Sequence, residues 1–371
     1  MAGIYIHIPF CKQACHYCDF HFSTNTRLKG LMLQALAKEF RLRQDYLGHL
    51  PVTSIYLGGG TPSLLEAEVL QTFLAHFPLQ DAVEVTLEAN PDDITLAKLQ
   101  AWRAMGINRL SIGVQSFQDP VLRYLNRVHD SQQAVASVAL AQKVGFDNLS
   151  IDLMYAIPEA NDAIWKADLA MVLQLQPPHL AAYCLTIEKN TAFGHWQEHG
   201  KLKRVPDEVA ARQFEILVET MTAQGYEHYE VSNFSFPGRY SLHNTNYWKQ
   251  GPYLGLGPGA HSYNGTTRQC NVAHNQRYID SLQQDVVPCT VEVLTPQDHI
   301  NEYVMTRLRT QWGCDVAWLK EAYGYDLEVV QGPYLDQLLD QQLAVMKGHN
   351  LVLTRQGKLL ADHIATNLFV D

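Results

Sequence analysis

The sequence predicts an α/β protein whose larger part is a partial (β/α)6 barrel and whose last part is a small α+β module. From residue 3 to about residue 185, short β-like runs alternate with longer helical patterns, which is typical of repeated βα units and a parallel sheet. The chain has 371 residues and exceeds the ~250 to 300 at which single hydrophobic cores stop growing, so a second, smaller unit is expected.

The barrel is predicted over residues 1–235. Its strands are expected at residues 4–8, 54–57, 83–88, 109–114, 148–153 and 180–185. The helices between them are expected at residues 27–47, 64–77, 96–105, 131–144 and 162–173. A further helix begins near Pro206, where proline and acidic residues occupy the first turn, and it ends at Gly225.

Two further segments follow the barrel. Residues 226–263 are rich in Gly, Pro and aromatic residues, so we expect irregular backbone that closes the mouth of the barrel. Residues 236–290 are therefore assigned as a closing and linking segment. Helical patterns after Pro296, with a hairpin at 343–346 and 351–354, predict a winged-helix-like domain over residues 291–371.

Composition and charge exclude several classes of protein. The net charge is −10, and residues 291–371 carry 6 basic against 11 acidic side chains, so nucleic acid is not an expected partner. No run of apolar residues approaches the ~20 that span a bilayer, and the first residues lack the features of a signal peptide. A cytoplasmic protein is expected. Seven cysteines in such a chain favour metal binding or catalysis over disulfides.

Three of the seven cysteines are clustered directly after the first predicted strand. The segment YIHIPFCKQACHYCDF places Cys11, Cys15 and Cys18 at a Cys-x3-Cys-x2-Cys spacing. Thiolates on so short a loop can converge on a soft metal centre such as an iron-sulfur cluster. The alternative is a structural zinc site that His16 or His21 would complete.

Other candidate residues follow the carboxyl ends of successive strands, where parallel barrels carry their functional loops. They are Gly58, Gly59, Gly60 and Thr61 after the second strand, Glu88 at the end of the third, Gln115 after the fourth, Arg127 in the helical segment beyond it, and Asp152 near the end of the fifth. Because these loops meet on one face, we expect one cofactor to contact all of them.

These motifs resemble a known family. The cysteine loop and the segments GGGTPS, LEANP, GVQSF, LNR and IDLMYAIP are similar, in order and spacing, to the radical S-adenosylmethionine family of oxygen-independent coproporphyrinogen III oxidases and their relatives. The likeness covers nearly the whole chain. It implies a partial (β/α)6 TIM-type barrel of the radical SAM kind with a C-terminal winged-helix-like domain.

The resemblance also implies cofactors and their residues. In that family three thiolates bind three irons of a [4Fe-4S] cluster, and S-adenosyl-L-methionine chelates the fourth, which assigns Cys11, Cys15 and Cys18 as metal ligands. The S-adenosylmethionine pocket would be lined by Tyr5, Tyr17, Gly59, Gly60, Thr61, Glu88, Gln115, Arg127 and Asp152.

Two departures separate the chain from the true oxidases. Phe20 stands where those enzymes carry a fourth cysteine, and the first strand is reached by Ile4, without their long N-terminal extension. Both features resemble the HemW-type branch of heme chaperones. The stretch HNTNYW, which begins at His243, matches the HNxxYW motif that marks this branch and is linked to heme binding.

The motif has two interpretations. An imidazole is a good axial ligand of heme iron, and Tyr247 and Trp248 could pack on the porphyrin plane. The alternative is that His243 only forms hydrogen bonds in the closing segment while the two aromatic residues belong to the core. A second axial ligand is not assigned, and three histidines remain open: His7, His228 and His261.

The resemblance leads to the hypothesis of a cytoplasmic heme chaperone. It would bind heme together with the cluster and S-adenosylmethionine, and deliver heme to apo-proteins such as respiratory enzymes. The family also implies homodimerisation and peripheral membrane contact as options. The alternative is an oxygen-independent coproporphyrinogen III oxidase, which decarboxylates propionates through a 5'-deoxyadenosyl radical. A third interpretation is another radical enzyme of unknown substrate. No catalytic residue is assigned, and cleavage of S-adenosylmethionine stays open.

Overall fold

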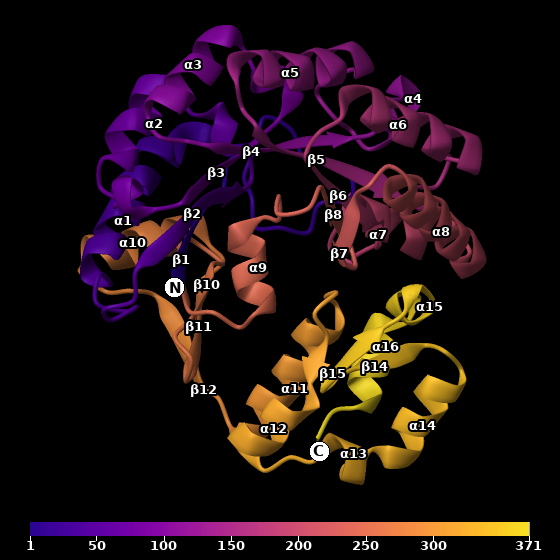
Figure 1. The fold of residues 1–371 in the computed structure, drawn as a ribbon. Coiled ribbons are helices and arrows are strands. Elements are labelled where there is room, and N and C mark those ends of the chain that lie inside the picture. Colours follow the sequence, from indigo (N-terminus) through magenta and orange to yellow (C-terminus); the bar gives the residue numbers. More distant parts are fainter. Residues whose placement is uncertain (371) are drawn as a thin grey trace.

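A computed structural model describes residues 1–370. Its centre is a sheet of 12 strands in the order β12-β11-β10-β9-β1-β2-β3-β4-β5-β6-β8-β7. The six parallel strands expected from the sequence are confirmed: β1 (Ala2–Ile8), β2 (Val52–Gly59), β3 (Glu84–Ala89), β4 (Arg109–Gln115), β5 (Asn148–Tyr155) and β6 (His179–Cys184). The sheet curves into an arc and keeps two open edges, β12 and β7, so the barrel is partial (Figure 1).

Helices cover the outer, convex side of this arc (Figure 1). They are α1 (Lys29–Leu42), α2 (Ala67–Leu74), α3 (Leu96–Ala104), α5 (Ser131–Val144), α6 (Asp162–Leu175) and α8 (Asp207–Ala223). Two short helices, α4 (Asp119–Tyr124) and α7 (Ala192–Glu198), pack instead in a separate cluster beside the cysteine loop. The prediction for α5 is confirmed at both ends. A capping box between Asp130 and Gln133 begins the helix, and Gly145 ends it at φ 91. Among residues 1–370, no helix is long and apolar enough to span a bilayer.

The prediction of irregular backbone over residues 226–263 is wrong. This segment holds β7 (Glu227–Glu230), β8 (Asn233–Ser235), α9 (Leu242–Trp248), β9 (Tyr253–Leu256) and β10 (His261–Tyr263). Strand β9 pairs in parallel with β1, and its residues Leu254 and Leu256 are buried in the main core. Long-range pairing with β1 therefore overrides the high Gly and Pro content, which only marks the bends between short strands.

Residues 236–290 share the barrel's core instead of standing apart from it. After β10 come β11 (Thr267–Asn271), α10 (Asn275–Gln283) and β12 (Cys289–Val293), and the strands extend the large sheet in antiparallel order. Tyr278, Ile279 and Leu282 of α10 pack in the same hydrophobic cluster as β1.

The C-terminal module has its own hydrophobic core. Its elements are α11 (Pro296–Leu308), β13 (Cys314–Asp315), α12 (Val316–Tyr323), α13 (Leu327–Val330), α14 (Gly332–Asp340), β14 (Ala344–Lys347), β15 (Asn350–Leu353), α15 (Arg355–Leu359) and α16 (Ala361–Asn367). The predicted hairpin is confirmed as β14 and β15, and β13 completes an antiparallel sheet of three strands. Helices with a small hairpin sheet agree with the predicted winged-helix-like arrangement.

Alternation along the parallel strands positions the functional residues. In β1, Ile4, Ile6 and Ile8 are buried toward the helices, whereas Tyr5 and His7 take the positions between them. The same alternation puts polar side chains inside the arc on every following strand, since successive residues of a strand point to opposite faces. These inward residues are Ser54 and Tyr56 on β2, Glu84 and Glu88 on β3, Arg109 and Ser111 on β4, Ser150 and Asp152 on β5, and His179 on β6. The inner face of the sheet is therefore polar.

Candidate functional site

The cysteine loop lies at the carboxyl end of β1. Two backbone hydrogen bonds close its base, from Cys11 N to the Ser23 carbonyl and from Ser23 N to the Pro9 carbonyl. Gln13 and Ala14 bond to Asn126 across the loop. All three cysteines of the loop are free thiols and partly exposed. Burial raises the pKa of Cys18 to about 11, so iron binding there would release a proton.

Arg127 connects this loop to two neighbouring strands. Its Nη1 donates to Cys15 Sγ at 3.4 Å and lies 3.5 Å from the Tyr17 hydroxyl, while its Nη2 donates to Asn90 Oδ1 and the Gly113 carbonyl at 2.7 Å each. The sequence placed Arg127 in a helix, which is wrong. It lies in the turn between α4 and α5, where Asn126 has φ 60, and this turn aims the guanidinium at the loop.

The GGGTPS segment packs directly against the cysteine loop. Gly60 N donates to the Ile8 carbonyl at 2.9 Å, and Thr61 N donates to the Phe10 carbonyl at 2.7 Å. A Cβ at Gly60 would lie 2.7 Å from the Phe10 backbone, so only glycine permits this approach. The Thr61 hydroxyl also bonds to the Cys11 thiol, whose pKa is raised mainly by burial.

The Glu88 carboxylate accepts hydrogen bonds from two residues. The Tyr56 hydroxyl donates to Oε1 at 2.8 Å, and Gly59 N donates to Oε2 at 3.1 Å. Burial, the largest cause, and the nearby Asp152 carboxylate raise the pKa of Glu88 to about 7, although the two hydrogen bonds oppose the shift. A carboxylate poised in this way can accept hydrogen bonds from a ligand at neutral pH.

Asp152 and Gln115 lie on the adjoining strands. Ser111 donates to both Asp152 oxygens, at 3.0 and 3.2 Å, and burial raises the pKa of Asp152 to about 6. Gln115 has φ 67 beside an irregularity in the pairing of β4 with β5. Its amide lies near Gly113, which also accepts from Arg127.

Tyr5 lies on β1, two residues before His7. Its hydroxyl bonds to His7 Nδ1 at 3.0 Å, and His7 Nε2 donates to the His21 carbonyl at 2.8 Å. Burial lowers the pKa of His7 to about 4, so this imidazole stays neutral and both nitrogens are occupied. The structure thus brings the predicted S-adenosylmethionine residues to one edge of the sheet around the cysteine loop, and their roles as ligands stay predictions.

His243 lies at the opposite end of the strands. A Cβ at Gly3 would come within 3.2 Å of its ring, and its Nδ1 bonds to Ser54 Oγ at 2.9 Å. Gly3 and Ser54 lie at the amino ends of β1 and β2, whereas the cysteines follow the carboxyl end of β1. From Gly3 to Ile8 a strand rises roughly 17 Å. The expectation that residues 226–263 close the mouth of the barrel is therefore wrong for α9, which covers the floor of the barrel at the amino ends of β1 and β2. The turn after β9 does reach the mouth, where a Cβ at Gly259 would lie 3.5 Å from the Cβ of His21.

Both ring nitrogens of His243 have partners. Nδ1 bonds to Ser54, and Nε2 bonds to the Tyr247 hydroxyl at 2.8 Å. The side chain is 1% exposed, and burial lowers its pKa to about 3. In this conformation neither nitrogen is free for a metal. A bond from Nε2 to iron requires that the Tyr247 hydroxyl move away.

The other candidate histidines have differing environments. His228 is partly buried and bonds through Nε2 to the Val231 carbonyl at 3.0 Å, whereas His261 is exposed and has Cys270 Sγ 3.6 Å from Nε2. For the zinc alternative, His16 bonds to the Tyr124 carbonyl and His21 to Asn275. Within residues 1–370, no three His, Cys, Asp or Glu side chains converge on one ion. A four-iron cluster distributes its thiolates over separate irons and does not need that convergence.

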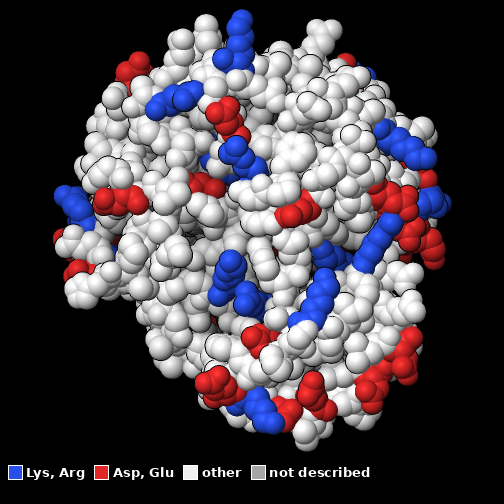
Figure 2. All heavy atoms as spheres, in the orientation of Figure 1, with Lys and Arg blue, Asp and Glu red and all other residues white. Residues whose placement is uncertain are grey.

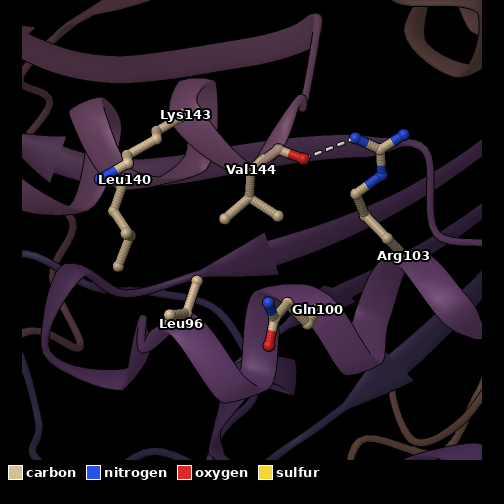
Figure 3. Close-up of a pocket in the computed structure, with 6 residues that line it drawn as sticks. All are labelled: Leu96, Gln100, Arg103, Leu140, Lys143 and Val144. Atoms are coloured by element: carbon tan, nitrogen blue, oxygen red, sulfur yellow. Dashed lines mark hydrogen bonds between the residues drawn. The ribbon is translucent and has the colours of Figure 1, made fainter.

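A hollow on the surface lies away from these residues. It measures about 390 Å³ between α3 and α5 on the outer side of the arc, and Arg103 at its rim donates to the Val144 carbonyl at 2.6 Å (Figure 3). None of its lining residues belongs to the loops that follow the strands. We therefore assign the site by the cysteine loop and not by this hollow.

Sequence reasoning missed three polar side chains of the inner face: Tyr56, Asn90 and Ser111. Tyr56 holds Glu88, Asn90 accepts from Arg127, and Ser111 holds Asp152. The alternation of polar and aliphatic residues along β2 and β4 was the available signal, because polar positions on buried parallel strands need partners.

Comparisons with known proteins extend over the whole chain. Residues 5–172 match the Radical SAM superfamily and residues 294–360 match the HemN C-terminal domain. A Bacillus subtilis protein named "Heme chaperone HemW" is 35% identical over 98% of this chain and 98% of its own length. A Mycobacterium tuberculosis protein of the same name is 36% identical over 99% and 94%. An Escherichia coli protein of the same name is 34% identical over 98% of this chain and 96% of its own length.

A solved structure is similar over the whole fold. Coproporphyrinogen III oxidase (HemN) from Escherichia coli, described as a radical SAM enzyme, superposes with a TM-score of 0.84 at 24% identity and covers 100% of this chain and 90% of that one. At this identity the likeness shows the fold alone.

Proposed function

This chain belongs to the radical SAM superfamily and, within it, to the HemW family, and from that premise we propose that it binds heme and passes it to apo-proteins. The observation that carries the proposal is the similarity to proteins named heme chaperones, which runs through both the barrel and the C-terminal module. The HNTNYW motif, and Phe20 in the place of the oxidases' fourth cysteine, point the same way.

Membership of the superfamily implies a [4Fe-4S] cluster and S-adenosylmethionine. The donor set at the mouth fits both: three partly exposed thiols on one loop, a guanidinium beside Cys15, and the buried carboxylates Glu88 and Asp152. Cys11, Cys15 and Cys18 would hold the cluster. The bound pair can supply a 5'-deoxyadenosyl radical, and the chaperone function proposed here does not depend on that step.

We propose that His243 Nε2 ligates the heme iron once the Tyr247 hydroxyl has left it. Two features of the closed state support this role. The buried imidazole is neutral at physiological pH, so it has a lone pair to donate. The bond from Nδ1 to Ser54 would fix the ring's orientation while Nε2 binds iron, as is usual for metal-bound histidines.

Phe20 marks the open side of the cluster loop and is 72% exposed. The oxidases that this chain resembles carry a fourth cysteine at that position. The phenyl ring of Phe20 can supply neither a proton nor a thiolate. Delivery to respiratory heme enzymes, a cytoplasmic location, peripheral membrane contact and homodimerisation are parts of the same proposal. They await tests with purified partners and vesicles.

Two assays on one sample test the proposed function. Protein reconstituted anaerobically with iron and sulfide is titrated with heme, and the same sample is incubated with coproporphyrinogen III, S-adenosylmethionine and a reductant. We expect saturable heme binding and no decarboxylated porphyrinogen. Turnover of coproporphyrinogen by a sample that fails to bind heme would support the oxidase instead.

A further inference from the structure

A cavity of about 170 Å³ lies between the barrel and the C-terminal module. From the module it is lined by Lys347, Arg355 and Lys358 together with Val352 and Leu353, and from the barrel side by His228. Figure 2 shows Lys and Arg side chains gathered along this boundary, while acidic side chains gather on the outer rim of the module. The cavity therefore combines three cationic groups with an apolar wall.

The concentration of positive charge is unusual for this module. Residues 291–371 carry 6 basic and 11 acidic side chains, yet half of the basic ones line this cavity. Arg355 forms an ion pair with Glu219 at 3.0 Å, and the Glu219 side chain is itself 70% exposed. No carboxylate of residues 1–370 pairs with Lys347 or Lys358.

Lys358 has unused hydrogen-bond capacity inside the protein. It is 8% exposed, and its Nζ has one acceptor in residues 1–370, the His228 carbonyl at 2.9 Å. An ammonium group carries three N–H donors, so two remain for a ligand or water. Burial is the main reason that the pKa of Lys358 falls to about 8; the Glu230 charge opposes this shift, and the Lys347 charge adds to it. Desolvating a charge without a counter-ion is costly, so an anion beside Nζ would be stabilising.

The buried carboxylate nearest in sequence to His228 is occupied elsewhere. Glu230 accepts from Arg309 at 3.0 Å, from Ser232 N at 3.0 Å and from Asn233 Nδ2 at 2.5 Å. His228 itself is neutral, because burial and the Lys358 charge lower its pKa to about 3. The cavity thus lacks a free negative group of its own.

We propose that this cavity binds a carboxylate, with Lys358 and Lys347 as its cationic partners and Val352 and Leu353 against its methylenes. We identify this carboxylate as a propionate of heme, and this identification rests on the proposed function. The volume accommodates a propionate side chain and excludes the porphyrin ring, which would remain outside on the side of α9.

The HNTNYW helix lies close enough in the fold to support this assignment. The Arg309 guanidinium lies 5.4 Å from the Trp248 ring, and Lys249 Nζ lies 4.8 Å from the Trp312 ring. Gln311, between these two contacts in the sequence, lines the cavity. Residues 309–312 therefore connect the motif to the cavity, so one heme could be held at its iron by the motif and at its edge by the lysines.

The test compares heme with heme dimethyl ester, in which both propionates are uncharged. Affinities are measured by Soret titration for the full chain, for Lys347→Gln/Lys358→Gln, and for the control Lys320→Gln, whose lysine pairs with Asp326 on the far side of the module. We expect wild type and control to prefer heme by about tenfold, as for loss of a charge-assisted hydrogen bond. The double variant should bind both compounds alike with an unchanged Soret band, because the iron ligand remains.

A second arm does not need heme. Sodium propionate is titrated against protein with ¹³C-methylated lysines, and the pKa of Lys358 is followed by NMR, with sodium chloride as the matched salt. Propionate should raise that pKa in wild type and Lys320→Gln. Equal binding of heme and its ester by wild type overturns the heme assignment while the proposed function stands. Failure of wild type to bind heme overturns the proposed function, and a propionate-insensitive Lys358 overturns the carboxylate site.

Discussion

The imidazole of His243 stacks on the Tyr56 ring, with ring centroids 5.0 Å apart and 27° between the planes. The Tyr56 hydroxyl in turn donates to Glu88, and Glu88 accepts from Gly59 of the GGGTPS segment. This column of contacts runs inside the sheet from the HNTNYW motif at the floor to the predicted S-adenosylmethionine pocket at the mouth. The two sites are thus separate in space and joined through two side chains.

The first prediction concerns the cluster. Anaerobically reconstituted protein should be brown and hold about four irons per chain, as a [4Fe-4S] centre requires. Cys15→Ala should lose the cluster, because it removes one of three thiolates, whereas Cys314→Ala, which removes a buried thiol of the C-terminal module, should keep it. Iron content and the visible spectrum measure both. A colourless protein with one zinc bound by the same thiolates would contradict the assignment.

Tyr247→Phe should strengthen heme binding. The hydroxyl blocks His243 Nε2 at 2.8 Å, and phenylalanine keeps the ring but removes the block. Loss of this bond should lower the free energy of unfolding by about 1 kcal/mol.

His243→Ala should weaken heme binding and change the Soret band, and Trp248→Ala should have a smaller effect. Soret titration of the three variants gives the order, and an unaltered affinity in His243→Ala would assign the motif a structural role.

Glu88→Gln should change how stability depends on pH. The folded pKa of Glu88 is about 7, above the ~4.3 of an unfolded chain, so between these values the unfolded state has released a proton that the folded state keeps. Stability from this group is therefore present below about pH 4.3 and lost as pH rises to about 7. The variant should be more stable than wild type at pH 8 by roughly 3–4 kcal/mol and equal at pH 4. Urea unfolding at both pH values measures these stabilities. An equal stability difference between variant and wild type at pH 4 and pH 8 would show that the pKa of Glu88 is not raised.

Phe20→Cys restores the fourth cysteine of the oxidases and should not create decarboxylase activity. A substrate pocket requires a supporting shell as well as one side chain, and Phe20 is exposed at the open side of the loop. Chromatography of porphyrinogens after incubation measures the product. Formation of decarboxylated porphyrinogen by this single variant would show that the chain is one substitution away from an oxidase.

The sequence predicts the parallel core well because its signals are local. The strand and helix boundaries around α5 follow from the capping residues Asp130 and Gly145 and from hydrophobic alternation. The cysteine loop and the strand-end residues could be predicted because all parallel strands present their carboxyl ends on one edge.

The floor of the barrel could not be predicted in the same way. Strand β9 forms only because it pairs with β1, some 250 residues earlier in the chain. No local sequence pattern predicts this pairing. The position of His243 depends on Ser54, Glu84 and Gly3, which are also far away in the sequence. The cavity of Lys358 likewise exists only where two units meet.

Transfer of heme to an acceptor tests the central claim most directly. The protein is loaded with one equivalent of heme, mixed with an apo-heme enzyme, and the Soret band of the acceptor is followed against a free-heme control. The account predicts that the acceptor becomes loaded from this protein while the bound Soret band decays in step, and that His243→Ala delivers less. An acceptor that gains heme no faster than the free-heme control, or a wild type that retains its heme, would contradict the chaperone function.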